Sequence, residues 1–431
     1  MKRIIVEDLK KWKNNADKKP LIMYGARQVG KTYSAVKFGK ENYDNTVYFN
    51  FEGNKALCSI FDLDLNPNRI ITELSAFCSQ KINKQNTLII FDEIQASEKA
   101  LTSLKYFCEE APEYNIIAAG SLLGLAVNRG SYSFPVGKVD ILTMYPLTFK
   151  EFLWATEKDG LIALIENAYK ESTPLSEALH AQAMELYRTY LIVGGMPAAV
   201  NEYVNKKDFD YVKIAQNAIY NAYTSDMTKY STQNEAMKTA AVYDSIPYQL
   251  ARENNKFQYN LIKSGARASA YEFSMEWLKK AGIVIQCAKT REGKMPLEFY
   301  KDATAYKIYM SDVGMLTAKS NYSPALILSN AHLGGEAKGA LTENYIAQEL
   351  FAKGNNLFYW ESDGKAEVDF VVQLADKVVP IESKAAENVK SKSFDLFRKK
   401  YSIDCGIRIS AKNFGLENGI KSVPLYAVFC I

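Results

Sequence analysis

Short apolar runs, each followed by glycine or by polar residues, recur in the first 150 residues of the chain. They lie at Leu21–Tyr24, Leu88–Phe91 and Ile116–Ala119. A continuous apolar run of this length is typical of a strand buried on both faces, as in a parallel sheet. Stretches with helical spacing separate the runs, as the crossovers between parallel strands require. The pattern predicts an α/β domain over residues 1–150.

The middle of the chain is mostly helical in its spacing. Residues 151–206 carry short amphipathic runs, and Gly194–Pro197 interrupts them. Pro197 suits the first turn of a further helix. Beyond residue 207, short helices are expected at Ile246–Leu250 and Tyr259–Lys263.

A longer helix is predicted at Ser269–Ala281, with Gly282 as its C-cap. Two strands are expected after it, at Ile283–Gln286 and Leu297–Tyr300, joined by the basic turn Lys289–Lys294. Helices followed by a hairpin describe a winged helix, which we predict for residues 207–325. Its basic residues could face nucleic-acid phosphates, a role weighed against simple solvation. These are Lys256, Lys263, Arg267, Lys279, Lys280, Lys289, Arg291 and Lys294.

The last hundred residues predict a second α/β domain, over 326–431. A helix is expected at Ala340–Lys353, followed by strands at Leu357–Glu361, Glu367–Leu374 and Lys377–Glu382. Because strand side chains alternate between faces, Asp369 lies on the face opposite Val368 and Phe370. By the same rule, Glu382 and Lys384 share a face.

Composition limits the class of protein. A chain of 431 residues is expected to form about two to four domains. Its net charge of +4 neither requires nor excludes nucleic acid. Six scattered cysteines without a C-x-x-C pair suit a reducing cytosol, and two histidines argue against histidine-based chemistry. The sequence shows no 18-residue apolar stretch and no secretion signal, so we expect a cytoplasmic protein without a membrane span.

The first apolar run leads into G-x-x-x-x-G-K-T, the Walker A phosphate loop. Its backbone N–H groups would surround the phosphates of ATP, and the following helix would add its positive N-terminus. Lys31 would reach the β- and γ-phosphates, and the Thr32 hydroxyl would bind Mg²⁺. The predicted nucleotide-binding residues are Gly25, Ala26, Arg27, Gln28, Val29, Gly30, Lys31, Thr32 and Tyr33.

The second run ends in two acids, Asp92 and Glu93, at the edge of the sheet where ligands of open α/β sheets bind. Asp92 would hold Mg²⁺, and Glu93 would orient the attacking water. Ser121 follows the third run, 29 residues after Asp92. It would serve as a sensor of the γ-phosphate, as in AAA-type ATPases, or would cap the next helix.

A second group of chemically active residues lies in the C-terminal segment. Asp369 is followed thirteen positions later by Glu382, Ser383 and Lys384, the D…E-x-K arrangement of PD-(D/E)xK nucleases. Asp369 and Glu382 would hold Mg²⁺, which acidifies a bound water, while Lys384 steadies the nucleophile. Glu343 would complete the acidic cluster or remain a solvated helix charge. The domain could also keep this fold only for binding.

Taken together, the chain resembles a family of uncharacterised prokaryotic AAA-type ATPases with a C-terminal domain of unknown function. The resemblance covers nearly the whole length and implies ATP binding, a winged-helix middle and a nuclease-like end. The motifs that carry it are Gly25–Thr32, Phe91–Gln95, Ala119–Leu123, Tyr145–Phe149, Val193–Pro197, Ser311–Gly314, Glu343–Leu350 and Ala366–Phe370.

One position departs from that pattern. Similar proteins carry Gly-Arg before the Tyr-Pro-Leu segment, whereas this chain has Gly137 and Lys138. A lysine lacks the bidentate fork of an arginine finger. Arg129, Arg188 and Arg267 are other arginines for that role or are ordinary surface arginines, and the sequence assigns none of them as the finger.

The sequence therefore predicts a multidomain α/β protein with four parts. These are an AAA-type P-loop domain (1–150), a helical lid over the nucleotide (151–206), a winged helix (207–325) and a restriction-endonuclease-like α/β domain (326–431). The function predicted is Mg²⁺-dependent ATP hydrolysis coupled to single- or double-stranded DNA, with a homo-oligomer as one form that the protein could take. The alternative is an ATP-dependent signalling switch or scaffold whose C-terminal domain binds a protein partner.

Overall fold

The computed structural model describes residues 1–120, 134–229, 231–252, 255–329, 335–362, 366–384 and 392–431. The chain forms two compact units. The first comprises Lys2–Tyr145, and the second comprises Pro146–Ile431 together with Met1. Each unit is described by itself below. Within the described residues, every helix is too short or too polar to cross a bilayer.

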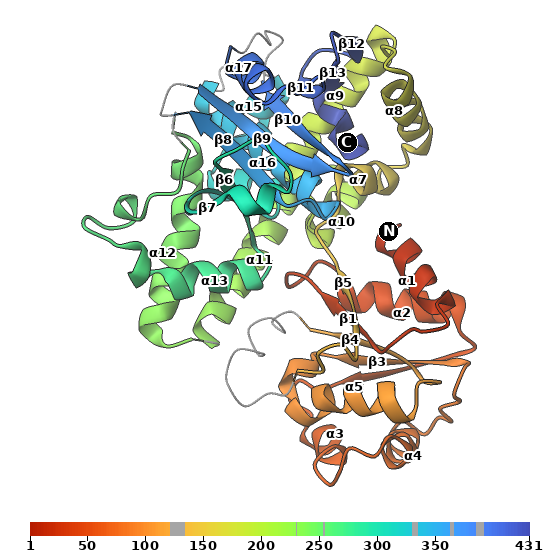
Figure 1. Cartoon of the computed structure of the whole chain (residues 1–431). Helices are drawn as coiled ribbons and strands as arrows, with labels where there is room; N and C mark the ends of the chain where they lie inside the picture. The colour runs from red at the N-terminus through yellow and green to blue at the C-terminus, as the bar shows by residue number, and fades with distance from the viewer. Residues whose placement is uncertain (121–133, 230, 253–254, 330–334, 363–365, 385–391) are drawn as a thin grey trace. The chain divides into compact units, whose positions relative to one another are not determined.

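The first unit is built on a five-stranded sheet in the order β2-β3-β4-β1-β5, and all of its strand pairs are parallel (Figure 1). Its elements in chain order are α1 (Ile5–Asn14), β1 (Leu21–Tyr24), α2 (Lys31–Asn42), β2 (Asn45–Asn50), α3 (Lys55–Ile60), α4 (Pro67–Cys78), β3 (Thr87–Asp92), the 3₁₀ turn η1 (Ile94–Ala96), α5 (Glu98–Glu110), β4 (Asn115–Ala119) and β5 (Asp140–Thr143).

The three apolar runs form β1, β3 and β4, which confirms the predicted parallel sheet. Every residue of β3 and β4 is buried, because helices cover both faces of a parallel sheet. On one face, Phe49, Phe51, Phe61 and Phe91 pack edge to face or tilted, with ring centroids 5.5–6.2 Å apart. This aromatic core fixes the end of β3, where Asp92 lies.

The second unit begins with helices. They are α7 (Phe149–Ala155), α8 (Asp159–Glu171), α9 (Glu177–Val193), α10 (Pro197–Lys206), α11 (Phe209–Lys229), α12 (Gln233–Leu250) and α13 (Glu272–Lys280), with the 3₁₀ turns η2 (Tyr259–Leu261) and η3 (Ala268–Ala270). The predicted helical character of residues 151–206 is confirmed, and Pro197 is the first residue of α10.

The rest of the second unit alternates strands and helices. Its elements are β6 (Val284–Thr290), η4 (Leu297–Tyr300), β7 (Lys301–Met310), α14 (Val313–Lys319), α15 (Pro324–Ser329), α16 (Gly335–Ala352), β8 (Leu357–Ser362), β9 (Ala366–Leu374), β10 (Lys377–Ser383), α17 (Lys392–Tyr401), β11 (Gly406–Ser410), β12 (Gly415–Glu417), β13 (Ile420–Pro424) and η5 (Leu425–Cys430). The strands form one mixed sheet in the order β12-β13-β11-β10-β9-β8-β6-β7.

The predicted winged helix is not confirmed. Residues Leu297–Tyr300 form a 3₁₀ turn rather than a strand, and β7 begins only at Lys301. Ile246–Leu250 is the end of the 18-residue helix α12 and not a helix of its own. Strand β6 pairs with β7 on one side and, in parallel, with β8 on the other. The strands expected to form the wing therefore belong to the C-terminal sheet. Five of the seven residues of β6 are buried there.

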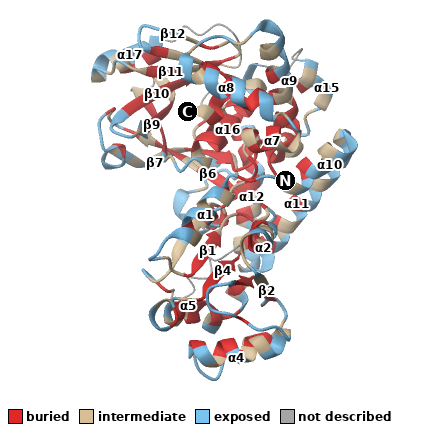
Figure 2. Ribbon diagram, turned by 90° about the vertical axis from the view of Figure 1, so that its right-hand side faces the viewer, coloured by how far each residue is buried: buried red, intermediate tan, exposed pale blue. Residues whose placement is uncertain are grey.

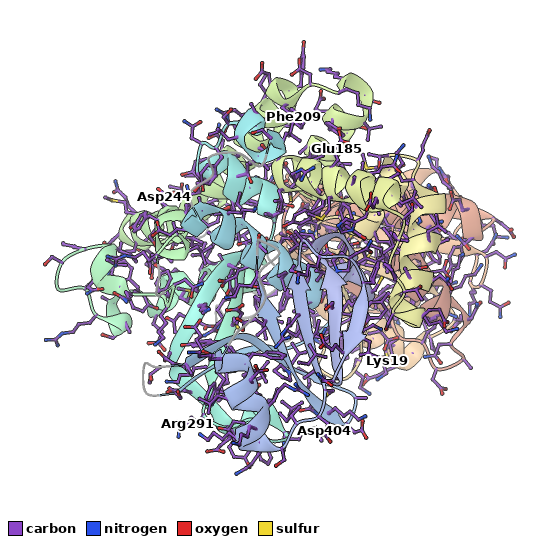
Figure 3. The ribbon with its side chains drawn as sticks, turned by 90° about the horizontal axis from the view of Figure 1, so that it is seen from above. Lys19, Glu185, Phe209, Asp244, Arg291 and Asp404 are labelled. Carbon is purple, nitrogen blue, oxygen red and sulfur yellow. The ribbon has the colours of Figure 1, made fainter. Side chains whose placement is uncertain are left out.

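The basic turn after β6 also packs against the C-terminal segment. Arg291 (labelled in Figure 3) accepts a hydrogen bond at its carbonyl from the Tyr401 hydroxyl at 3.4 Å. A Cβ on Gly293 would lie 2.5 Å from Phe397 and 2.6 Å from Tyr401. The close approach of Gly293 to α17 holds this turn against the domain.

The predicted helix and three strands of the C-terminal segment are confirmed as α16, β8, β9 and β10. Both β8–β9 and β9–β10 are antiparallel, and β11 returns parallel to β10 after α17. Figure 2 shows the middle of α16 as buried, and every residue from Ala340 to Leu350 except the partly exposed Glu343 is buried. A helix buried on all sides is unusual for a sequence that carries Glu, Asn and Gln, so those side chains must be bonded internally.

These polar side chains bind the backbone of neighbouring elements. Asn344 accepts from Met310 N at 2.8 Å and donates to Met310 O at 3.0 Å. Gln348 accepts from Val313 N, and Glu349 accepts from Phe149 N, both at 2.8 Å. Asp312 accepts from Gly195 N and from Met315 N. Several polar side chains of the motif Glu343–Leu350 therefore bind backbone groups inside the second unit.

Candidate functional sites

The phosphate loop has the strained backbone that its glycines permit. Gly25 and Gly30 have φ values of 141° and 94°, and Gln28 lies in the left-handed region at 66°. A Cβ on Gly25 would lie 2.1 Å from the carbonyl oxygen of Met144, so only glycine fits there. Helix α2 begins directly after the loop, at Lys31.

Arg3, which the sequence analysis missed, supports the loop. Its guanidinium donates to Val29 O at 2.8 Å and to Tyr145 O at 2.6 Å, and the residue is buried. The buried guanidinium of Arg3 binds the carbonyl oxygen of Val29 and so helps to hold the backbone of the loop in its conformation. No sequence signal marks it, because its partners are backbone atoms 26 and 142 positions away.

Lys31 is buried at the mouth of the loop. Its ammonium donates to Gly25 O at 2.9 Å and to Ala26 O at 2.8 Å. Burial lowers the pKa of Lys31 to about 8, and the nearby charges of Glu93 and Asp92 oppose that shift. An ammonium bonded to carbonyl oxygens can exchange these partners for phosphate oxygens, which bind it more strongly.

Thr32 and Asp92, both predicted as Mg²⁺ ligands, lie together. Thr32 Oγ1 donates to Asp92 Oδ2 at 2.9 Å. The same oxygen accepts from the Tyr48 hydroxyl at 2.7 Å. Tyr48 lies on the edge strand β2 and was not predicted as a site residue. It lies two residues before Asn50, which pairs in register with Asp92, and this strand pairing could have pointed to it. A hydroxyl and a carboxylate are hard oxygen ligands and fit a Mg²⁺ ion.

Glu93 takes a left-handed conformation, with φ at 49°, directly after β3. Such strain in a residue other than glycine clusters at functional sites. The Gln95 side chain donates to its carboxylate. Burial raises the pKa of Glu93, and the charge of Asp92 adds to that shift, which makes the carboxylate a better proton acceptor.

Other predicted residues are less informative. Strand β4 lies between β1 and β3, and Ala119 is in register with both Met23 and Asp92. Ser121, predicted to follow that strand, and Arg129 lie outside the described residues. Tyr33 is exposed at the start of α2. Lys138 forms a 2.9 Å ion pair with Glu109.

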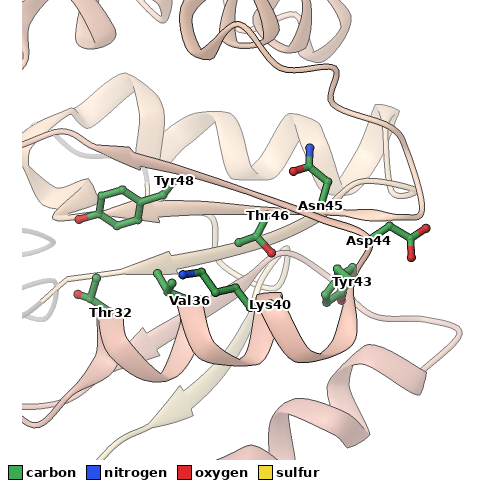
Figure 4. Close-up of a pocket in the computed structure, with 8 residues that line it drawn as sticks. All are labelled: Thr32, Val36, Lys40, Tyr43, Asp44, Asn45, Thr46 and Tyr48. Atoms are coloured by element: carbon green, nitrogen blue, oxygen red, sulfur yellow. The ribbon is translucent and has the colours of Figure 1, made fainter.

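A groove runs from Thr32 along α2 and β2 (Figure 4). It has a volume of about 530 Å³. Thr32 and Tyr48 lie at one end of it in the figure, and Tyr43 and Asp44 lie at the other. The Tyr48 side chain is therefore reachable from solvent.

The D…E-x-K residues of the second unit also come together. Ser383 donates to Asp369 Oδ2 from its backbone N at 2.7 Å and from its hydroxyl at 2.8 Å. Lys384 forms a 3.1 Å ion pair with Glu382. Burial and the charges of Glu382 and Glu343 raise the pKa of Asp369 to about 8. Two carboxylates that repel each other in this way are the donor set expected of a divalent cation site.

Glu343 faces residues that the sequence analysis did not include in the site. Its Oε2 accepts from Asn255 at 2.7 Å and from the Tyr309 hydroxyl at 3.0 Å. The buried Lys307 ammonium lies 3.5 Å from the same oxygen and 2.5 Å from Glu367. Within the described residues, no three acidic, histidine or cysteine side chains are grouped so as to hold a metal ion. Asp369 and Glu382 remain as the pair that fits one.

Several basic residues predicted to face phosphates are instead paired within the chain. Lys256 and Lys289 lie 2.5 Å and 3.2 Å from Glu361, whose carboxylate is nearly buried. Lys279 pairs with Glu276 at 2.6 Å, and Lys294 with Glu292 at 3.3 Å. The positive charge available to a nucleic acid is smaller than the sequence count implied.

Comparison with protein families agrees with the geometry of the first unit. Residues 17–153 match the family described as an AAA domain. The first unit carries an AAA-type P-loop ATPase domain. Residues 184–325 and 338–428 match two further families, each described as a domain of unknown function. No curated protein matches the chain.

Solved structures give distant matches. The Walker-type ATPase PABY2304 of Pyrococcus abyssi is 14% identical, with a TM-score of 0.45, and the match covers 73% of this chain and 94% of that one. The ORC2 protein of Aeropyrum pernix is 12% identical, covers 79% and 94% of the two chains and has a TM-score of 0.37. The RuvB Holliday junction branch migration motor of Thermotoga maritima is 14% identical, covers 63% and 82% and has a TM-score of 0.28.

Proposed function

We propose that this protein is a Mg²⁺-dependent ATPase that couples its nucleotide state to the binding or processing of DNA. The observation that carries the ATPase part is the convergence of Lys31, Thr32 and Asp92 at the end of the parallel sheet, within an AAA domain. The DNA part rests on Asp369, Glu382 and Lys384 in the second unit.

In the ATPase reaction, the N–H groups of Gly25–Thr32 bind the phosphates, and Lys31 gives up its carbonyl partners to neutralise the β- and γ-phosphate oxygens. Thr32 and Asp92 would hold Mg²⁺, which supplies further positive charge to the phosphates when bound. Glu93 orients the attacking water and accepts its proton. The buried surroundings of Glu93 raise its proton affinity, and therefore its pKa, toward that task.

In the second unit, the succession α16-β8-β9-β10-α17-β11 supports a nuclease-like fold, with Asp369 and Glu382 on adjacent strands. These two carboxylates would hold a divalent cation, whose role when bound is to acidify a water molecule. Lys384, partly exposed, is placed to stabilise the nucleophile or the phosphate charge.

The second candidate is an ATP-dependent switch or scaffold whose C-terminal part binds a protein. The pairing of Lys256 and Lys289 with Glu361 favours it, because it removes two cations from the surface that DNA would need. The rate of ATP hydrolysis with and without DNA separates the two functions. Stimulation by DNA supports the first, and indifference to DNA supports the second.

The ATPase proposal is tested with Lys31→Ala, which should abolish ATP binding or turnover. Lys37→Ala is the matched control, because Lys37 is on the same helix and pairs with Glu41 at the surface. Full turnover in Lys31→Ala would contradict the proposal.

The nuclease part is tested by incubating single- and double-stranded DNA and RNA with Mg²⁺ or Mn²⁺. Cleavage should be lost in Asp369→Ala and in Lys384→Ala but kept in Asp376→Ala, at the exposed turn between β9 and β10. If the unaltered protein leaves every nucleic acid intact, this part of the proposal is wrong.

A further inference from the structure

Lys307 is a deeply buried charged group near the C-terminal acidic residues. It lies on β7 opposite Cys287 of β6, and only 1% of its side chain is exposed. Its ammonium lies 2.5 Å from Glu367 Oε1 and 3.5 Å from Glu343 Oε2, and it faces the Tyr359 ring at 5.2 Å from the centroid. These partners come from α16, β8 and β9.

A lysine in this position stays charged. Burial alone would lower the pKa of Lys307, but the charges of Glu343, Glu367 and Asp369 outweigh burial and raise it. An unpaired buried ammonium would be prohibitively costly, so the lysine and its carboxylates form one electrostatic unit.

The described charges around Asp369 do not cancel. Four carboxylates lie in this region, namely Glu343, Glu367, Asp369 and Glu382, and two ammonium groups, Lys307 and Lys384, oppose them. With all six side chains ionised, as binding of a cation by Asp369 requires, their sum is two negative charges. One divalent cation would balance that sum, and two would leave an excess of positive charge.

Glu343 is also engaged by protein donors. Besides Lys307, Asn255 and the Tyr309 hydroxyl donate to its Oε2. Lys307, Asn255 and Tyr309 all precede residue 326, outside the predicted nuclease-like domain. They hold the Glu343 carboxylate toward β7, where it contacts Lys307.

We propose that Lys307 is a built-in cation that takes the place of a second metal ion, so that this site binds one divalent cation, through Asp369 and Glu382. Lys307 is a positioning residue that acts through Glu343 and Glu367. The inference rests on the metal-dependent part of the proposed function. It also assigns a role to the β6–β7 hairpin, which completes the acidic site.

The test is a calorimetric titration of the full chain with Mn²⁺ in the absence of nucleotide. The C-terminal site is identified as the binding that disappears in D369N/E382Q. We expect one such Mn²⁺ per chain in the unaltered protein. In Lys307→Met, which removes the ammonium beside Glu343 and Glu367 and leaves one more negative charge uncompensated, we expect two.

The double variant K307M/E367Q removes one charge of each sign and should return the stoichiometry to one. Glu367→Gln alone keeps Lys307 and removes one negative charge, so it should weaken Mn²⁺ binding by about tenfold. Glu367→Gln is a conservative change of a partly exposed side chain. If circular dichroism shows that Lys307→Met does not fold, Glu367→Gln still tests the inference.

Two Mn²⁺ ions at the C-terminal site of the unaltered protein would overturn the inference, as would one Mn²⁺ at this site in folded Lys307→Met or unchanged affinity in Glu367→Gln. Mn²⁺ binding that is the same in D369N/E382Q as in the unaltered protein would also overturn it. Failure of the proposed nuclease activity is seen separately, as Mn²⁺ binding at this site without cleavage of any nucleic acid.

Discussion

The Tyr48 hydroxyl donates a 2.7 Å hydrogen bond to Asp92 Oδ2, the carboxylate oxygen that also accepts from Thr32 Oγ1 at 2.9 Å. This contact links the edge strand β2 to the candidate Mg²⁺ ligands. A carboxylate with two fixed donors on one oxygen cannot rotate freely, so its other oxygen is held in one direction. Tyr48 is therefore expected to orient Asp92.

Tyr48→Phe should raise the Mg²⁺ concentration needed for half-maximal nucleotide binding by about three- to tenfold, because one hydrogen bond to a charged acceptor is lost. Turnover at saturating Mg²⁺ should stay close to that of the unaltered protein. Tyr43→Phe is the matched control, since it lines the same groove and its hydroxyl has no hydrogen-bond partner among the described residues. An equal Mg²⁺ dependence in Tyr48→Phe and Tyr43→Phe would contradict the role of Tyr48.

Glu93→Gln should separate ATP binding from ATP hydrolysis. The amide keeps the size of the side chain but cannot accept the proton of the attacking water, so turnover should fall by about 10²- to 10⁴-fold. ATP affinity, measured with a fluorescent analogue, should change little because Lys31, Thr32 and Asp92 are intact. Loss of binding together with turnover would instead assign Glu93 to the structure of the loop.

Gly195→Ala should destabilise the second unit. A Cβ at this position would lie 2.0 Å from the carbonyl oxygen of Leu147, a backbone atom that cannot move aside without breaking the Leu147 N to Gly195 O hydrogen bond of 2.6 Å. We expect a loss of about 2 kcal/mol or more in the free energy of unfolding, measured with urea. Gly160→Ala, in α8 with open space around its Cα, should stabilise the protein by up to ~1 kcal/mol.

Glu349 should make the stability of the second unit depend on pH. Burial, and to a lesser degree the charge of Glu151, raises the pKa of Glu349 to about 8, against an ordinary value of 4.5. The folded chain thus binds this proton more tightly than the unfolded chain does. The resulting stability is complete below pH ~4.5 and is lost as the pH rises toward ~8.

Glu349→Gln should flatten that dependence, because the amide stays neutral and can still accept from Phe149 N. Melting temperatures measured between about pH 5 and about pH 8.5 should fall less in Glu349→Gln than in the unaltered protein. Glu336→Gln, at an exposed position of the same helix, should follow the unaltered curve. Parallel curves for all three proteins would show that Glu349 is ionised in the fold.

Some residues of the candidate sites could be predicted from local sequence patterns, and others could not. The loop residues Gly25–Thr32 and the pair Asp92 and Glu93 were found because phosphate binding requires fixed spacing next to an apolar strand. Tyr48 and Arg3 were missed, because each acts on a partner far away in the sequence, whose position depends on how the chain folds.

The sequence by itself determined the parallel sheet, its loop and the strands that carry Asp369 and Glu382, because apolar runs and alternation specify strands locally. Only the tertiary structure decided that β6 joins β8 and that Lys307 lies among Glu343 and Glu367. A hairpin has two free edges, and its own residues do not say which other strand will cover them. The partner of a buried charge is likewise chosen by packing across the whole unit.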